Sequence, residues 1–162
     1  MIYQKYLLIS LKKYEENKRI VEKFKRKKTA LLDNIFHELH EKVFEEIDCL
    51  KCANCCKTTS PIFYMKDIER AAKALKMKAS AFIDKYLKVD EDNDYVLKSA
   101  PCFFLDHENY CTIYNDRPTA CREYPHTNRK RMVQILDITL KNTLVCPAVA
   151  KIFTHLNENN QS

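Results

Sequence analysis

Residues 49–56 read CLKCANCC, and this stretch decides what kind of domain the chain can build. It contains half of the cysteines in the chain, and the others are Cys102, Cys111, Cys121 and Cys146. Thiolates are soft ligands that suit zinc and iron–sulfur clusters, and each such site takes about four of them. The 8 cysteines of the chain therefore fit one or two metal centres.

Structural disulfides are the main alternative to metal ligands. Cysteine makes up about 5% of the chain, below the roughly 8 to 10% that marks a short secreted disulfide scaffold. The first residues, MIYQKYLLISLKKYEE, have a lysine inside the apolar run and no small-residue cleavage site, so they do not resemble a signal peptide. We expect a cytoplasmic protein, because thiols there stay reduced and dense cysteine patterns more often bind metal.

The longest uncharged apolar runs are short, as in YLLISL at residues 6–11. They fall far below the roughly 18 to 20 residues that a membrane-spanning helix needs. We therefore expect no membrane segment, and with 46% hydrophobic residues the chain can close a core of its own.

The spacing of the first cysteines leaves the type of metal centre open. Cys49, Cys52 and Cys55 form a C-x2-C-x2-C pattern, which lets a tight turn direct three sulfurs at one centre. Bacterial ferredoxins use this spacing and complete it with a later Cys-Pro, a part that Cys146-Pro147 can take here. Zinc is equally compatible with C-x2-C pairs. Zinc, iron and an iron–sulfur cluster are all candidate cofactors.

Cys55 and Cys56 are adjacent, and this suggests a second set of ligands. Neighbouring side chains diverge in an extended backbone and point about 100° apart in a helix. The two thiols can therefore serve different centres. The second candidate set is Cys56, Cys102, Cys111 and Cys121. The alternative for an isolated cysteine is a small buried hydrophobic residue.

Other side chains near these cysteines have two interpretations each. Arg117 and Arg122 can donate hydrogen bonds to thiolate sulfur and offset its charge, or they can pair with neighbouring carboxylates on the surface. His107 and His126 can complete a mixed site, although such histidines are more often exposed or hydrogen-bonded elsewhere. With all the thiols available, neither histidine is required.

Glycine is absent from the chain. This excludes a Walker loop, a dinucleotide-binding fingerprint and a Gly-x-Ser-x-Gly elbow, since each needs glycine for positive φ or for close approach to phosphate. Left-handed turn positions must then fall to asparagine and aspartate. We expect such turns in DEDNDY at 90–95 and in DHENY at 106–110.

Hydrophobic periodicity predicts the elements. Apolar residues at three- and four-residue steps predict a helical segment over residues 1–48, with a break near Lys28 or Thr29. Short strands are predicted at PIFYM, YVLKS and CFFLD, and a helical turn at RPTACREYP. Further helices are predicted from Asp67 as the cap to Leu75, from Ser80 to Tyr86, from Met132 to Leu140, and from Pro147 onward.

These elements predict an α+β, mainly α, protein with a small cysteine-rich domain. The predicted division is an N-terminal helical segment over 1–48, a metal-binding cysteine-cluster domain over 49–156 and a disordered tail over 157–162. Within the first segment, residues 12–28 hold a surplus of basic residues equal to the net charge of the whole chain, +6. A basic helical face can dock on nucleic acid, but a solvated Lys-rich helix with interspersed Glu is the commoner case.

Taken together, CLKCANCC, PCFFLD, CTIYNDRPTACREYP and the late Cys-Pro resemble the YkgJ-type cysteine-cluster family, described as a zinc- or iron-chelating domain with a CxxCxxCC motif. The resemblance covers about residues 49–147. It implies that the metal ligands are Cys49, Cys52, Cys55, Cys56, Cys102, Cys111, Cys121 and Cys146. The family often has glycine between its second and third cysteines. This chain has Ala53 there, and we expect Asn54 beside it to take the left-handed conformation.

Four roles are compatible with such a site. The first is a metal-chelating cytoplasmic protein. The second is an iron–sulfur enzyme, since flagellin lysine N-methylases contain a similar region, although this chain is short and has no Gly-rich loop for S-adenosylmethionine. The third, a thiol oxidoreductase, would need a thioredoxin-like context that the sequence does not show. The fourth is a nucleic-acid-associated module with a structural metal.

Overall fold

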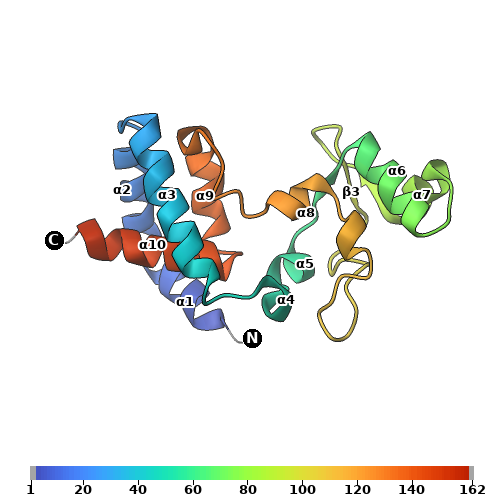
Figure 1. Cartoon of the computed structure of the whole chain (residues 1–162), viewed down its shortest axis with the longest axis horizontal. Coiled ribbons are helices and arrows are strands. Elements are labelled where there is room, and N and C mark those ends of the chain that lie inside the picture. The colour runs from blue at the N-terminus through green and yellow to red at the C-terminus, as the bar shows by residue number, and fades with distance from the viewer. Residues whose placement is uncertain (1–2, 161–162) are drawn as a thin grey trace. The chain divides into compact units, whose positions relative to one another are not determined.

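Residues 3–160 are described by the structure, which is a computed structural model. They form an α+β, mainly α, fold in two compact units, whose elements are labelled in Figure 1. The helical unit comprises Met1–Cys52 and Pro125–Ser162, and the sheet unit comprises Ala53–Tyr124. The fold class predicted from the sequence is confirmed.

The helical unit brings together the two ends of the chain. Its elements are α1 (Gln4–Lys12), α2 (Tyr14–Phe24), α3 (Thr29–Phe44), α4 (Cys49–Cys52), the 3-10 helix η2 (Met132–Ile135), α9 (Leu136–Asn142) and α10 (Pro147–Asn160). The predicted break near Lys28 or Thr29 is confirmed, since α3 begins at Thr29. A second break at Lys13 separates α1 from α2.

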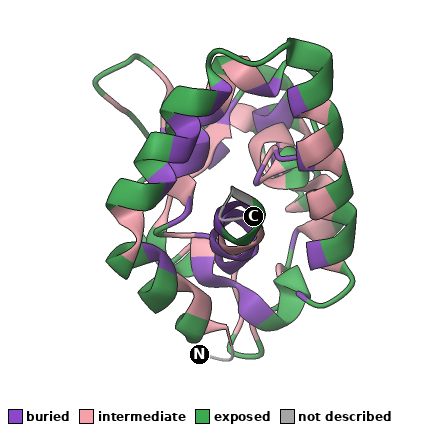
Figure 2. Ribbon diagram, turned by 90° about the vertical axis from the view of Figure 1, so that its left-hand side faces the viewer, coloured by how far each residue is buried: buried purple, intermediate pink, exposed green. Residues whose placement is uncertain are grey.

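Helix α10 is the centre of the helical unit, and it packs against α1, α2, α3 and α9. Figure 2 looks along this helix and shows its buried residues surrounded by the other helices. Phe153 of α10 meets Phe36 of α3 edge to face, with 6.4 Å between ring centroids, and Phe36 meets Phe24 of α2 at 6.2 Å. Such edge contacts add to the burial of the rings, so one aromatic row joins three helices.

The C-terminal residues belong to this packing. Asn157 is buried, and its Nδ2 donates to Oδ1 of Asn17 at 2.7 Å, while Asn17 donates to the hydroxyl of Ser10 at 3.0 Å. Residues 157–160, predicted as a disordered tail, instead continue α10, because the buried amide finds its partner in α2. Residues 161–162 lie outside the described residues.

Helix α3 also holds the segment that enters the helical unit just before η2. His40 Nδ1 lies 2.8 Å from the hydroxyl of Thr127, and His37 donates from Nε2 to the carbonyl of Arg129 at 2.8 Å. Asp33 accepts two backbone N–H groups of the same segment, each at 2.8 Å. These contacts, with the packing of α10, place residues 125–156 with the N-terminal helices. The predicted 49–156 domain is therefore divided between the two units.

The sheet unit contains α5 (Asn54–Thr58), β1 (Ile62–Phe63), α6 (Met65–Ala74), α7 (Ala79–Tyr86), β2 (Leu87–Val89), β3 (Tyr95–Leu97), the 3-10 helix η1 (Tyr114–Asp116) and α8 (Thr119–Glu123). Its strands form an antiparallel sheet in the order β1-β3-β2. In the central strand, Val96 pairs with Ile62 on one side and with Lys88 on the other.

Three sequence predictions are confirmed in the sheet unit and two need correction. The strands at PIFYM and YVLKS and the helical turn at RPTACREYP are present. The predicted strand at CFFLD is wrong, because the backbone turns there: Leu105 N donates to Cys102 O at 3.1 Å, leaving an isolated bridge to Cys111. Helix α6 begins two residues before Asp67, whose carboxylate instead accepts the backbone N–H of Tyr64 at 3.2 Å.

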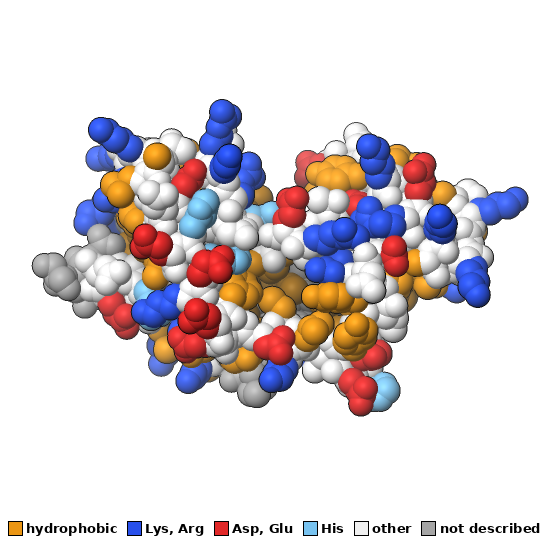
Figure 3. Space-filling view, viewed as in Figure 1, with side chains coloured by type: hydrophobic (Ala, Val, Ile, Leu, Met, Phe, Trp, Pro, Cys, Tyr) orange, Lys and Arg blue, Asp and Glu red, His pale blue; other side chains and the backbone are white. Residues whose placement is uncertain are grey.

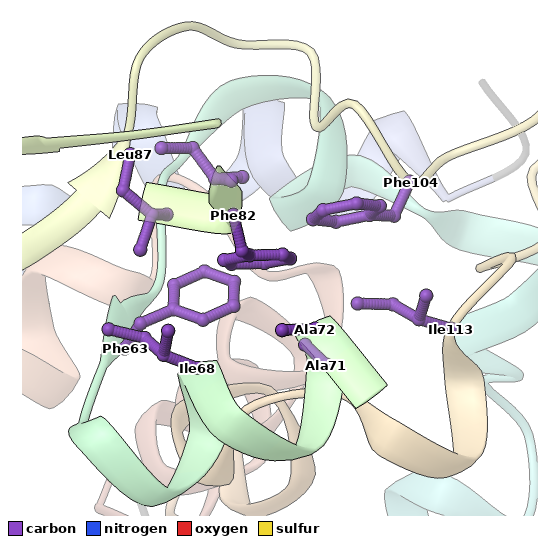
Figure 4. Packing of buried hydrophobic residues seen from close by; sticks show 9 residues of the cluster. Phe63, Ile68, Ala71, Ala72, Phe82, Leu87, Phe104 and Ile113 are labelled. Atoms are coloured by element: carbon purple, nitrogen blue, oxygen red, sulfur yellow. The ribbon is translucent and has the colours of Figure 1, made fainter. Parts of the chain in front are cut away.

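A compact aromatic core anchors the loops of this unit. Figure 4 shows Phe82 of α7 parallel to Phe104, and their rings are 5.8 Å apart with an interplanar angle of 8°. Ile113 lies in the same cluster as Phe63, Ile68, Ala71, Ala72, Leu87 and Leu97. Phe104 follows Cys102 by two residues and Ile113 follows Cys111 by two. The core therefore fixes the loops that carry both cysteines.

Left-handed backbone falls where the turns require it. Asn93 and Asn109 have φ of 62° and 66°, which confirms the left-handed turns expected in residues 90–95 and 106–110. The expectation that such positions fall to asparagine and aspartate alone is wrong, because Lys76, His126 and Arg131 also have positive φ. Between the first cysteines the prediction was wrong: Ala53, not Asn54, takes the left-handed conformation, with φ 48° and ψ 19°. Helix α4 ends at Cys52 and α5 begins at Asn54, so the single linking residue must make the turn.

No single helix among residues 3–160 is long and apolar enough to cross a membrane. Met132–Asn142 and Pro147–Asn159 reach that length and hydropathy only as a pair, and the pair is bent by 109°.

The basic segment 12–28 spans α2 and the turn that follows it. Its charged side chains are exposed or partly exposed, and Lys25 pairs at 2.9 Å with both Glu22 and Asp137. A shallow groove on α2 mixes both signs of charge and is lined by Glu15, Lys18, Arg19, Glu22, Lys23 and Arg26. Figure 3 likewise shows Lys and Arg mixed with Asp and Glu on the face in view. The solvated-helix interpretation stays a prediction.

Candidate metal centre

All the cysteines lie within the described residues, and each is in the reduced state. They divide between the two units. The helical unit holds Cys49, Cys52 and Cys146, and the sheet unit holds Cys55, Cys56, Cys102, Cys111 and Cys121. The predicted first set, with Cys55 as a member, is therefore split between the units, whereas the predicted second set lies entirely in the sheet unit.

Four separate segments supply the thiols of the sheet unit. Cys56 lies in α5, and its carbonyl accepts the backbone N–H of Cys102 at 2.8 Å, which ties α5 to the loop after the sheet. Cys111 forms the isolated bridge with Leu105, and Cys121 lies in α8. We call Cys56, Cys102, Cys111 and Cys121 the sheet-unit set.

Burial keeps most of these thiols protonated when no metal is bound. It raises the pKa of Cys102 to about 11 and that of Cys121 to about 12, and it also raises the pKa of Cys111. Negative charge on Cys56 raises the pKa of all three further. Such coupling requires that the sulfurs lie within electrostatic reach of one another. The sheet-unit set is thus a group of neighbours in space.

Cys56 differs from the other members of the sheet-unit set. A hydrogen bond from the Cys55 thiol lowers the pKa of Cys56 to about 7, against the effect of burial, and the positive charge of Lys57 lowers it further. Thiolate is the form that binds metal. Cys56 therefore offers the first ligand near neutral pH, and the Cys55 sulfur is directed toward it.

Hydrogen-bond donors and a positive charge around the sheet-unit set can offset the negative charge of several thiolates. Backbone N–H groups from the following two or three residues bond to the sulfurs of Cys102 and Cys111 and lower their pKa values, against the larger effect of burial. The charge of Arg117 acts in the same direction on Cys111 and Cys121. These donors stabilise sulfur in its ligand form, as groups around metal-bound thiolates do.

The arginines near Cys121 also hold the turn before α8. Arg117 lies over the ring of Tyr114, with 3.8 Å from its guanidinium carbon to the ring centroid. Arg122 donates to the carbonyls of Arg117 at 3.1 Å and of Asn115 at 2.6 Å. Arg117 thus acts on the thiols through its charge, while Arg122 fixes the backbone between η1 and α8.

Asp67 positions α8, a role that the sequence interpretation missed. Its buried carboxylate accepts from Arg70 Nη2 at 2.7 Å and from Thr119, through the backbone N–H at 3.1 Å and the hydroxyl at 3.0 Å. Arg70 also donates to the carbonyl of Arg117 at 2.8 Å. The available signal was the Asp-x-x-Arg spacing on α6, which places acid and base one helical turn apart.

Three thiols of the helical unit form a second group. Cys49 and Cys52 begin and end the single turn of α4, and Cys146 comes immediately before α10. Burial raises the pKa of Cys146 to about 12, backbone N–H groups of Val149 and Ala148 lower it, and negative charge on Cys49 and Cys52 raises it. We call Cys49, Cys52 and Cys146 the helical-unit set.

The model of the CxxCxxCC family, described as "Putative zinc- or iron-chelating domain", matches residues 48–147. The match takes in more than half of the chain and every cysteine. The chain belongs to this family. The resemblance noted in the sequence is therefore confirmed, and a zinc- or iron-chelating domain is what the CxxCxxCC family describes. No curated protein and no solved structure matches the chain.

Neither group of thiols forms a coordination shell in this structure. Among residues 3–160, no three His, Cys, Asp or Glu side chains already converge so that they could hold an ion. The donor chemistry fits zinc or iron, because each set is made of thiols alone and no histidine belongs to either. His107 is exposed, and His126 is half-buried in left-handed backbone with φ 63°.

Proposed function

We propose that the protein binds zinc or iron through cysteine thiolates, and that one such centre is held by Cys56, Cys102, Cys111 and Cys121. The observation that carries this proposal is the sheet-unit set itself. Its thiols come from four segments of the chain, lie within electrostatic reach of one another and belong to one compact unit. Membership of the CxxCxxCC family supports the same chemistry.

A bound ion changes the protonation of this set. The thiols with raised pKa values lose their protons on binding, because coordination to a cation stabilises the thiolate far more than burial opposes it. A divalent ion with four thiolates carries a net charge of about −2 by formal count, which the N–H groups and Arg117 offset. Tetrahedral zinc and iron–sulfur clusters both accept this donor set.

The proposed role of this centre is to stabilise the sheet unit, because four closed positions leave no ligand place for a substrate. Binding energy at such a site contributes directly to folding. A cytoplasmic location, where thiols remain reduced, is part of the proposal.

Elemental analysis of anaerobically purified protein tests the proposal, with a visible spectrum to separate colourless zinc from a brown iron–sulfur protein. We expect at least one metal ion or cluster per chain. The Cys121→Ser variant should lose one equivalent, whereas Ala120→Ser, which adds a hydroxyl next to the site and keeps every thiol, should retain it. Wild-type protein that contains no metal and titrates every cysteine as a free thiol would contradict the proposal.

A further inference from the structure

Two basic segments that are far apart in the sequence lie at the same end of the helical unit. Residues 23–28, KFKRKK, end α2 and form the turn before α3, and they contain five basic residues and no acidic one. Residues 129–131, RKR, come immediately before η2. We call these two segments together the basic end. Figure 3 shows Lys and Arg side chains at the upper end of this unit, where Figure 1 places the end of α2 and the start of α3.

Contacts with α3 fix the second segment near the first. Asp33, in the second turn of α3, accepts the backbone N–H groups of Arg131 and of the next residue, each at 2.8 Å. One helical turn later, His37 donates from Nε2 to the carbonyl of Arg129 at 2.8 Å. A helix rises about 1.5 Å per residue, so the five residues from Lys28 to Asp33 cover about 8 Å along the axis. The RKR segment therefore runs along the first turns of α3, close to the turn that precedes this helix.

The basic side chains of this end are exposed, and the acidic groups beside them leave most of the positive charge facing solvent. The exposed residues are Lys23, Lys25, Arg26, Lys27, Lys28, Arg129, Lys130 and Arg131. Glu22 and Asp137 both pair with the same lysine, Lys25, at 2.9 Å, and Asp33 already accepts two backbone N–H groups. The groove further along α2 includes Glu15 and Glu22, so positive charge is more concentrated at the basic end than along α2.

The row of charges along α3 fits the phosphate backbone of a nucleic acid. Successive phosphates of one strand lie about 3.4 Å apart along a duplex. The part of α3 from Lys28 to His37 is about 14 Å long, so the row faces about four phosphates of a strand. Exposed Lys and Arg side chains bind such a polymer by displacing its counterions. The guanidinium groups of Arg129 and Arg131 also present paired donors that match phosphate oxygens.

The apolar side chains near the basic end favour a nucleic acid over a lipid membrane. Leu31 of α3 and Ile138 of α9 are exposed, but together they carry fewer carbons than one acyl chain, which by itself binds a membrane only marginally. Phe24, the aromatic residue of residues 23–31, is buried with 3% of its surface exposed, so it offers no ring on which a base could stack. The contacts are therefore with phosphates, which carry no sequence information.

We propose that the basic end binds the phosphate backbone of nucleic acid without selection of base sequence. This surface is smaller than the whole basic segment 12–28, because it uses only the last residues of that segment. It also includes residues 129–131, which α3 holds at the same end of the unit. The inference is separate from the proposed metal chemistry, since neither basic segment contains a cysteine.

Salt-dependent binding of the full chain to fluorescent poly-U RNA and to a fluorescent DNA duplex tests the proposal. The test variant changes Arg129, Lys130 and Arg131 to Gln. The hydrogen bonds from α3 to this segment use its backbone, so the variant keeps them. We expect the slope of log affinity against log salt to fall by about 2–3 and the affinity at physiological salt to fall at least about tenfold. The control changes three exposed lysines of the sheet unit to Gln and should keep the wild-type slope; these are Lys66, Lys73 and Lys78.

Wild-type protein without salt-dependent binding, an unchanged slope in the test variant, or an equal loss in the control would overturn the proposal. Tighter binding to phosphatidylserine vesicles than to either nucleic acid at the same salt, lost in the test variant, would overturn it in favour of a membrane surface. If the test variant does not fold, lysine acetylation of the wild type decides. Bound RNA should protect Lys27, Lys28 and Lys130 and leave Lys73 and Lys78 reactive, whereas equal reactivity with and without RNA would overturn the proposal.

Discussion

At the scale of single residues, the absence of glycine has its clearest effect at Ala53, an alanine with positive φ. Positive φ falls on non-glycine residues throughout the described chain, among them Asn93 and Asn109, whose short polar side chains tolerate it. Alanine has no such compensation, and its Cβ is crowded at φ 48° by roughly 1 kcal/mol. The chain retains this strain because the turn between α4 and α5 allows one residue only.

We predict that Ala53→Gly stabilises the protein by about 0.5–1 kcal/mol, since removal of the Cβ relieves more strain than the added flexibility of the unfolded chain costs. Urea unfolding of the metal-loaded protein measures it. The matched control is Ala81→Gly, at an exposed position inside α7, which should destabilise by a similar amount. Equal destabilisation by both substitutions would show that Ala53 is not strained.

At the scale of elements, Asp67 decides how α6 and α8 meet. Burial would raise the pKa of this carboxyl, but hydrogen bonds from Arg70 and Thr119 outweigh it and hold the pKa below its ordinary value of 3.8. A carboxylate with a lowered pKa adds stability that is complete above the ordinary value and is lost as the pH falls through the folded value. Asp67 thus keeps Cys121 in place at neutral pH.

We predict that Asp67→Asn lowers the free energy of unfolding by about 2–3 kcal/mol at pH 7, because it leaves Arg70 without its ion pair. The difference in free energy of unfolding between wild type and variant should become smaller as the pH falls below 3.8. Denaturant titrations of both proteins at each pH give this difference. Asp84→Asn, at an exposed position on α7, is the control and should change little. A gap that stays constant on acidification would argue against the carboxylate's role.

The helices and strands also show which local sequence signals were sufficient to predict secondary structure. Helical periodicity predicted α3, whose buried residues are Leu32, Phe36 and Val43, whereas Ser80 and Pro147 marked the starts predicted for α7 and α10. Strand β2 was missed, since it follows α7 directly without a turn residue between them. The strand predicted at residues 102–106 is absent. The apolar side chains there enter the core from a turn, and periodicity in the sequence does not distinguish a buried turn from a buried strand.

At the scale of the whole molecule, the cysteine spacing separated the sheet-unit set from the rest, and the structure places those thiols in one unit. Their role as ligands stays a prediction. Spacing did not show that residues 125–160 return to the N-terminal helices. The apolar face of α10 is visible in the sequence, but its partner is chosen by packing with α1 and α3, which no local pattern specifies.

The two units depend on metal to different degrees because their cores differ in size. Most of the largest fully buried side chains, including Phe36, Phe153 and Leu32, belong to the helical unit, whereas the sheet unit contributes Phe82, Ile68 and Leu97. A unit of about 70 residues with a small core commonly needs a metal or disulfides to remain folded. We therefore expect the proposed thiolate centre to supply the larger share of the stability of the sheet unit.

We predict that metal removal by a chelator under reducing conditions unfolds the sheet unit and leaves most of the helical unit folded. Amide hydrogen exchange should lose protection across Ala53–Tyr124, while α2, α3 and the middle of α10 remain protected by their own core. Added Zn²⁺ should restore the lost protection, which controls for irreversible damage. Simultaneous loss of protection in both units would show that the helical unit does not remain folded without metal. Unchanged protection in the sheet unit would show that its small core is sufficient without metal.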